Sequence, residues 1–411
     1  MLTIAFLCLL LAAQAPQATA SQPDLTLAAV VDMYFQHNLE LEAGRYRVER
    51  ARADQIAARL RPNPGLSISA ENLRLSGPTS FGRLYEVAAS YSDTIELGGK
   101  RELRLSIADL TTAAAEASFS EAMRQGLAQT KRLYFETLLA GYHLAAAVEN
   151  RLTFDQLVTI NLSRFKEGAV AEADLIKVRL ERARFESAVH QSELGLRQMM
   201  IRLLDRIGQP ITIHRGASGD LERTGGSLDL ASLREQALRN RPDIQAAEFE
   251  LEAAGERVSL EQARNIPDLN PFVGFKRVGS DNTVMAGVTI PLRIRDRNEA
   301  GIARAEAGRK IADAQLRQVR NRVLAEVESA YAAYEAAVHE LATFRMDLLP
   351  PADESRTIAL ASYREGAADL LEVLETQRTR TAIRQEYYRT LFEYHSSVLL
   401  LEAAVGKEIQ P

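Results

Sequence analysis

Histidine and cysteine, which supply many metal ligands and catalytic groups, are rare and widely separated in this chain. The histidines are His37, His143, His190, His214, His339 and His395. No two of them stand at the spacing of a metal site. Motifs for a phosphate loop, a His-Glu-x-x-His zinc site or a Gly-x-Ser-x-Gly nucleophile are also missing from the sequence. We therefore expect no enzyme activity, no cofactor, and no catalytic or metal site.

The charged residues are numerous but evenly mixed. The chain has 50 Lys and Arg against 55 Asp and Glu, a net charge of −5, and the two signs are interleaved. This pattern gives no basic surface for nucleic acid, so we exclude a nucleic-acid partner. The many carboxylates are explained most simply as solvated helix faces.

The N-terminus has the features of an export signal. Leu2 to Ala13 is an apolar run, and Ala18 to Ala20 fits the small-residue pattern before a signal-peptidase cut. Residues 1–20 are therefore predicted to be a signal peptide. A membrane anchor is the alternative, but the run is shorter than the roughly 20 residues that a spanning helix needs. The only cysteine, Cys8, lies in this segment, so the predicted mature chain has no thiol.

A very long helix dominates the first half of the chain. From Gly98 to Gly168 the sequence contains no proline, and its apolar residues recur at helical spacing. At 1.5 Å per residue, such a helix would be roughly 100 Å long. Globular domains seldom contain a helix of this length, so coiled-coil or barrel-like packing against similar helices is expected.

The sequence contains an internal two-fold repeat, 21–215 and 216–411. Leu25 to Ala28 matches Leu228 to Ala231, and Glu167 to Ala169 matches Glu365 to Ala367. Each repeat reads as two helices, two strands and a long helical hairpin. In the second repeat, Pro350 and Pro351 are expected to break or kink the first helix of the hairpin. Such repetition predicts two copies of one structural unit.

The strands are expected at about 66–97 and 271–293. Tyr85 to Ile95 and Val284 to Leu292 alternate apolar with polar side chains. This period is typical of a lipid-facing barrel strand, and a half-buried strand of a soluble sheet has the same period. Four strands cannot close a barrel, so a membrane protein of this kind must oligomerise.

Several motifs resemble the TolC-type outer-membrane efflux proteins of Gram-negative bacteria. They are Arg61 to Pro64, Ala70 to Asn72, Thr94 to Arg101, Arg164 to Gly168, Tyr363 to Gly366 and Leu371 to Leu374. The Pro-Asn-Pro and Ile-Glu-Leu-Gly-Gly-Lys-Arg motifs resemble those of the subfamily that exports cobalt, zinc, cadmium or copper. The resemblance covers essentially the whole mature chain.

The resemblance implies an α+β fold in which long helices form a trimeric α-barrel. The four strands of each chain would complete a twelve-stranded transmembrane β-barrel. The protein would be a homotrimer in outer-membrane lipid, with a long periplasmic portion. Its implied partners are a periplasmic adaptor (membrane fusion) protein and an inner-membrane pump of the resistance-nodulation-division class.

The resemblance also implies functional residues at two hairpin tips. Arg164 and Gly168 in the first tip, and Arg364 and Gly366 in the second, would dock the adaptor; two solvent-facing turns are the alternative. Tyr363, Glu372 and Glu375 would form a periplasmic gate. A spacing of three puts both carboxylates on one helix face, where three-fold symmetry would make stacked acidic rings. Where the family has a gate arginine this chain has Ala368, and a solvated acidic face remains the alternative for the carboxylates.

The expected function is the outer-membrane exit duct of a tripartite efflux system, conducting divalent heavy-metal cations passively from periplasm and pump to the exterior. Within the same architecture, a multidrug or type I secretion channel is the alternative. A soluble periplasmic coiled-coil scaffold would explain the helices and the export signal, but not the paired alternating strands.

Overall fold

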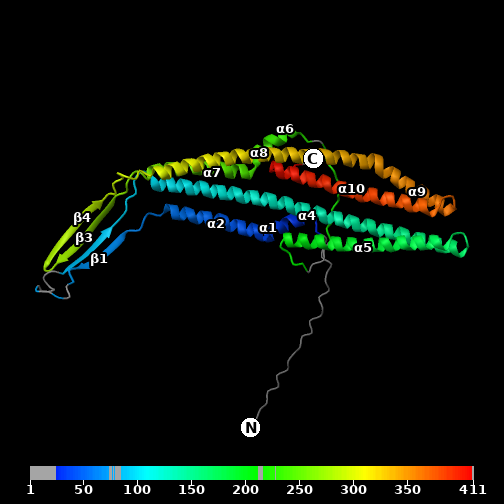
Figure 1. Cartoon of the computed structure of the whole chain (residues 1–411), viewed down its shortest axis with the longest axis horizontal. Helices are drawn as coiled ribbons and strands as arrows, with labels where there is room; N and C mark the ends of the chain where they lie inside the picture. The colour runs from blue at the N-terminus through cyan, green and yellow to red at the C-terminus, as the bar shows by residue number, and fades with distance from the viewer. Residues whose placement is uncertain are drawn as a thin grey trace, which may run out of the picture.

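The computed structural model describes residues 25–73, 76, 78, 85–211, 216–226 and 228–409. The predicted signal peptide and most of the predicted first loop, 76–83, lie outside these ranges. The molecule is a long rod with a small sheet at one end and two helical hairpins reaching the other end (Figure 1). It is mostly helical, as the sequence predicted.

The same order of elements occurs in both halves of the chain. The first half contains α1 (Leu27–His37), α2 (Leu39–Arg59), β1 (Gly65–Glu71), β2 (Glu86–Ser92), α4 (Lys100–Lys166) and α5 (Glu172–Arg206). The second contains α6 (Leu230–Asn240), α7 (Pro242–Ala263), β3 (Asn270–Val278), β4 (Asp281–Thr289), α8 (Glu299–Thr343), η1 (Phe344–Leu348), α9 (Leu349–Glu365) and α10 (Leu370–Val405). The two orders agree except that η1 interrupts the first hairpin helix of the second half, and the internal repeat stays a prediction.

The long helix expected between Gly98 and Gly168 is α4, which is 67 residues long. In the second half, the corresponding path is interrupted by η1, a π-helical turn just before Pro350. A proline lacks the backbone N–H that would continue the α-helical pattern, so the helix restarts with Pro350 in its first turn. The predicted break is therefore present. None of the described helices is both long and apolar enough to cross a membrane.

The described strands form an antiparallel four-stranded sheet in the order β1-β2-β3-β4. Residues directly opposite each other share a face, as Leu66 and Tyr91 do. One face carries Leu66, Ile68, Val87, Tyr91, Val273, Phe275, Val284 and Val288. The other carries Ser67, Ser69, Glu71, Glu86, Ser90, Lys276, Thr283 and Thr289. The first face is thus mainly apolar, although it also carries Arg277 and Asn282, and the second is mainly polar, although it also carries Phe272, Val278 and Met285.

The strands are shorter than expected. The described part of β1 ends at Glu71 because Asn72 has a φ of 58°, which interrupts the extended backbone. Strand β2 ends at Ser92, and beyond it Ile95 makes only an isolated bridge to Leu269. Strand β4 ends at Thr289, two residues before Pro291, which has no N–H to donate.

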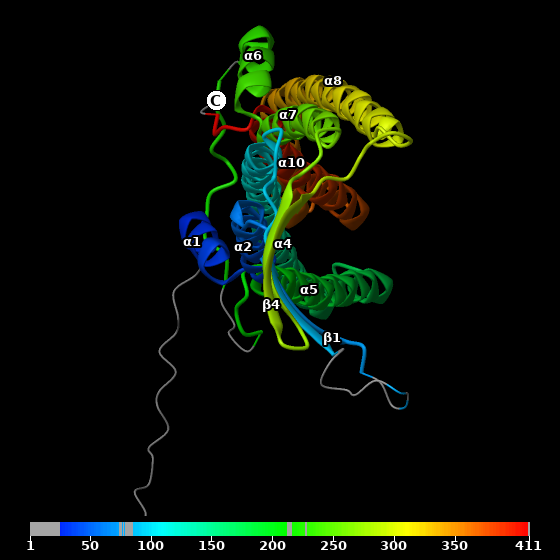
Figure 2. The same ribbon diagram turned by 90° about the vertical axis from the view of Figure 1, so that its left-hand side faces the viewer.

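Four helices extend the sheet into a layer in the order α2, α4, α7, α8, where each helix packs on the next. Viewed along the rod, the sheet is bent into an arc (Figure 2). Strand β1 and helix α2 lie at one edge of this layer, and β4 and α8 lie at the other.

A buried arginine fixes the end of α10 at mid-height. Arg241 is 1% exposed, and its guanidinium binds both carboxylate oxygens of Asp243 at 3.0 and 2.8 Å. It also donates to the carbonyls of Ala403 and Ala404 in the last turn of α10. Although burial opposes ionisation, Arg241 lowers the pKa of Asp243. In the first half, Asn38 donates in the same way to the Arg206 carbonyl at the end of α5.

Replacing Arg241 should destabilise the protein strongly. Arg241→Met leaves the buried Asp243 carboxylate without its main partner, which costs about 3–5 kcal/mol in the free energy of unfolding. Thermal unfolding followed by circular dichroism measures the effect. The control is Arg239→Met, which removes an exposed pair with Glu235 in α6 and should leave the melting temperature unchanged. Equal melting temperatures for the two variants would contradict this role of Arg241.

Candidate functional site

The two hairpins end next to each other at the end of the rod opposite the sheet (Figure 1). The first tip follows α4, where Gly168 has a φ of 75°. Its N–H donates to the backbone carbonyl of Phe165 at 3.0 Å. The N–H of the next residue, Ala169, donates to the backbone carbonyl of Arg164 at 2.8 Å. A side chain at Gly168 would meet no atom within 4 Å. The left-handed backbone, rather than crowding, therefore requires glycine here.

The second tip follows α9 and has the same geometry. Gly366 has a φ of 82°, and its N–H donates to Tyr363 at 3.1 Å. The N–H of Ala367 donates to Ser362 at 2.8 Å. Helix α10 then begins with Asp369 as its N-cap, because the Asp369 carboxylate accepts the N–H of Glu372 at 2.8 Å. Both tips are thus tight turns closed by a glycine.

The tips are joined through Tyr363. Its hydroxyl donates to the Asn161 side-chain oxygen on α4 at 2.6 Å, and the ring is 3% exposed. Arg164 donates to the Tyr363 carbonyl at 3.0 Å, and its guanidinium lies 5.0 Å from the centre of the ring. Ala368, where the resemblance implies a gate arginine, cannot supply a guanidinium here. The guanidinium at this contact comes instead from the other hairpin.

Below this contact the hairpins share an apolar cluster. Its buried residues are Phe154, Leu157, Val178, Ala359, Tyr363, Leu370, Val373 and Leu374. A polar layer follows toward mid-height, where Arg380 binds Asp353 and Glu149. Arg356 lies in the same layer. Its pKa is lowered, mainly because it is buried and also because the positive charge of Arg380 is nearby. The second hairpin is therefore held to α4 by both apolar and charged contacts.

The predicted gate carboxylates lie apart from these contacts. Glu372 and Glu375 are exposed in the first turns of α10, and neither forms an ion pair with a described residue. Arg364 is exposed as well, whereas Arg164 is occupied by Tyr363. The structure thus brings together Arg164 and Tyr363 among the predicted residues, and leaves Arg364, Glu372 and Glu375 facing solvent in the single chain.

Sequence reasoning missed Asn161 and the polar layer. The signal for Asn161 was a polar residue four and seven positions after the apolar Leu157 and Phe154, on the same helix face. Its partner stands 202 residues away, so the sequence alone did not pair them. Within the described ranges, no group of three or more His, Cys, Asp or Glu side chains could hold a metal ion.

Comparison with known proteins supports the resemblance. Residues 233–407 match the family described as outer membrane efflux protein. The cobalt-zinc-cadmium resistance protein CzcC of Cupriavidus metallidurans is 27% identical over 93% of this chain and 90% of its own length. The nickel and cobalt resistance protein CnrC of the same organism is 29% identical over 72% of this chain and 68% of its own.

The fold agrees with that of solved channels. A crystal structure of CusC, solved to describe conformational changes that accompany folding and transmembrane channel formation, has a TM-score of 0.78 and 19% identity, and the match covers 97% of this chain and 99% of that one. The predicted resemblance is confirmed: the chain is similar in fold to a solved channel and in sequence to heavy-metal resistance proteins, and its residues 233–407 match the outer membrane efflux protein family. This is a family of channel proteins and not of enzymes.

Proposed function

We propose that this protein is the outer-membrane exit duct of a tripartite efflux system for divalent heavy-metal cations. It would receive cations from a periplasmic adaptor and an inner-membrane pump of the resistance-nodulation-division class, and conduct them passively to the exterior. The cargo is inferred from relatives that are named for cobalt, zinc, cadmium and nickel resistance.

The observation that carries the proposal is that the sheet of one chain does not close into a barrel and leaves two strand edges unpaired. The sheet has a mainly apolar face, and its outer strands β1 and β4 each present an open edge. Unpaired backbone groups cannot face hydrocarbon, so in a membrane these edges must pair with another chain. Pairing the β1 edge of one copy with the β4 edge of the next repeats head to tail, and in a closed ring such pairing would leave no open edge. Three copies would give the twelve strands that the family resemblance implies.

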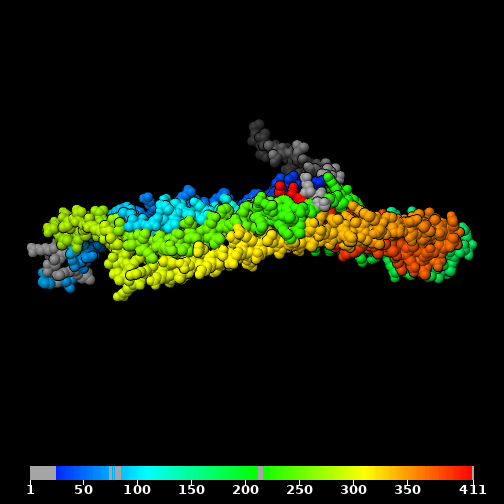
Figure 3. Space-filling view, turned by 90° about the horizontal axis from the view of Figure 1, so that it is seen from above, coloured from blue at the N-terminus to red at the C-terminus, as the bar shows by residue number. Residues whose placement is uncertain are grey.

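The helices at the two edges of the layer have complementary surfaces. Between α7 and α8 runs a groove of about 700 Å³, lined on α8 by small residues such as Gly301, Ala305 and Gly308. These helices lie side by side along the rod (Figure 3). At the opposite edge of the layer, α2 exposes large apolar side chains, among them Tyr46 and Ile56. Large side chains on α2 of one copy would fit the groove of the next.

At the tips, Glu372 and Glu375 would form two rings of carboxylates in the closed assembly. Their exposure and their lack of ion-pair partners within the described chain leave both charges free to attract cations. Tyr363, held by Asn161 and Arg164, would keep the second hairpin in its resting position. Gly168, Gly366 and the exposed Arg364 would meet the adaptor, and Arg164 would be accessible to it only when it leaves Tyr363.

Removing both gate carboxylates should weaken cation block of the channel. Glu372→Gln with Glu375→Gln keeps the side-chain shapes but removes the charge, so we expect block by zinc or a trivalent cobalt complex to weaken by about tenfold or more. Conductance of the purified protein in planar bilayers measures this. Glu235→Gln, on α6 away from the tips, is the control and should behave like the parent. A block that is unchanged in the double variant would refute the cation role of the pair.

A growth experiment tests the proposed function. A strain that lacks this protein should become sensitive to zinc, cobalt, cadmium or copper and keep normal tolerance to hydrophobic drugs, because the duct would serve a metal pump. The intact gene should restore growth. Drug sensitivity with normal metal tolerance would overturn the metal assignment and move the cargo to drugs. If carbonate extraction releases the protein from membranes, the channel assignment itself fails.

A further inference from the structure

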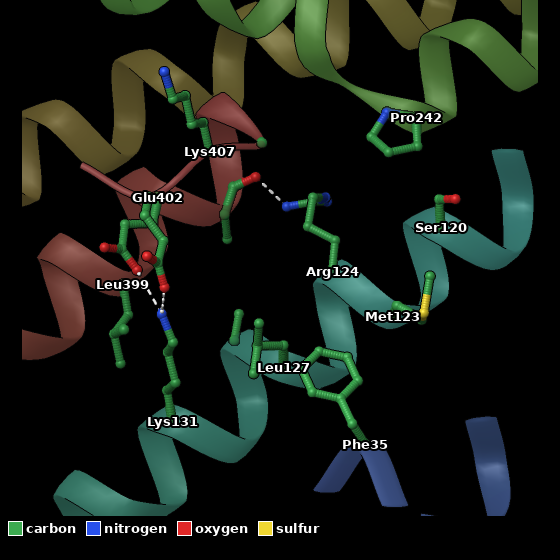
Figure 4. A pocket seen from close by; sticks show the side chains of 14 residues that line it. Phe35, Ser120, Met123, Arg124, Leu127, Lys131, Pro242, Leu399, Glu402 and Lys407 are labelled. Carbon is green, nitrogen blue, oxygen red and sulfur yellow. Dashed lines mark hydrogen bonds and ion pairs between the residues drawn. The ribbon is translucent and has the colours of Figure 1, made fainter. Parts of the chain in front are cut away.

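A cavity lies at mid-height, far from both the sheet and the tips. It has a volume of about 330 Å³ and is enclosed by the end of α1, the middle of α4, the start of α7 and the end of α10 (Figure 4). Its lining is mainly apolar and includes Phe35, Met123, Leu127, Pro242 and Leu399. The proposed transport role uses none of these residues.

A buried ammonium group lies at one end of the cavity. The Lys131 side chain is 11% exposed, and its Nζ lies 3.3 Å from Glu402 and 2.9 Å from Glu408 (Figure 4). Burial disfavours the charge, but the two carboxylates outweigh it and raise the pKa of Lys131. The ammonium therefore stays charged and requires an anion beside it.

The two carboxylates differ in how firmly they are held. Glu402 belongs to α10, is 17% exposed, and has a pKa that burial raises. Glu408 belongs to the tail that follows Gly406, and its side chain is 79% exposed. The Glu408 carboxylate faces water, which can solvate it when it leaves Lys131, so another carboxylate can take its place beside the ammonium. Because one carboxylate replaces another, the charge at Lys131 does not change.

The nearby Arg124 does not compete for such a ligand. Its guanidinium binds both oxygens of Glu121 and the carbonyl of Ala403 at the end of α10. Its hydrogen bonds are thus directed at the protein. Lys407 also lines the cavity, but its ammonium is directed away from the apolar lining (Figure 4), so we assign the anionic head of a ligand to Lys131.

We propose that this cavity binds a medium-chain fatty acid. The carboxylate would sit on Lys131 Nζ in place of Glu408, and the alkyl chain would lie against Leu127, Met123 and Phe35. At roughly 30 Å³ for each water-sized group, the cavity has room for a chain of about ten carbons. Each methylene buried there adds about 0.8 kcal/mol of favourable transfer free energy. This binding is independent of the transport role.

The absence of tryptophan from the chain gives a clean reporter. Phe35→Trp places a single indole in the cavity, and the full-length protein in nanodiscs is titrated with 11-bromoundecanoate, whose bromine quenches indole fluorescence. We expect saturable quenching by this carboxylate, and about tenfold weaker binding of 11-bromoundecanol, which has the same chain without the charge. Equal quenching by acid and alcohol would overturn the proposal.

Two further variants, each combined with the reporter, separate binding from folding. Glu408→Gln removes the competing carboxylate and keeps Lys131, so it should tighten binding of the bromo acid. Lys131→Met should weaken it about tenfold, while Lys310→Met, at an exposed position of α8 that does not line the cavity, should not change it. Unchanged affinity in Glu408→Gln would show that the carboxylate does not replace Glu408, and this would also overturn the proposal.

Discussion

The open edges of the sheet are the constraint on which the rest of the structure depends. A backbone N–H or C=O without a partner is costly in an apolar medium, and β1 and β4 each present a row of such groups beside a mainly apolar sheet face. Helices α2 and α8 continue the two edges down the rod, so in the proposed assembly sheet and helices would meet the next copy along one seam. The small residues of α8 and the large ones of α2 suit such a seam.

The contacts at mid-height and at the tips hold helices of the same chain together. Arg241 and Asn38 hold the ends of the returning helices α10 and α5 beside the short helices of each half. The tip half of the second hairpin begins after the π-helical turn η1 and is tied to α4 by Tyr363 and the Arg380 layer. Charged and hydrogen-bonded contacts are directional, so they set the register of the hairpins more sharply than apolar packing does.

Local features could be predicted from the sequence. The length of α4, the two glycine turns and the interruption before Pro350 follow from residue types and spacing. The exact ends of the strands could not, because they depend on the φ of Asn72 and on side chains across the sheet. The gate role of Tyr363 stays a prediction, and the sequence did not predict its contacts with Asn161 and Arg164. Contacts between residues about 200 positions apart leave no trace in a single sequence.

One cross-linking measurement tests the proposed seam most directly. The predicted mature chain has no cysteine, so Ile56→Cys on α2 and Ala305→Cys on α8 introduce its only thiols. Within one chain α4 and α7 separate these helices, so a short bismaleimide should join different chains. We predict covalent dimers and trimers, and no larger species, on a denaturing gel of the double variant. The single variants should remain monomeric. A double variant that gives only monomers, or an open ladder beyond three chains, would contradict the account.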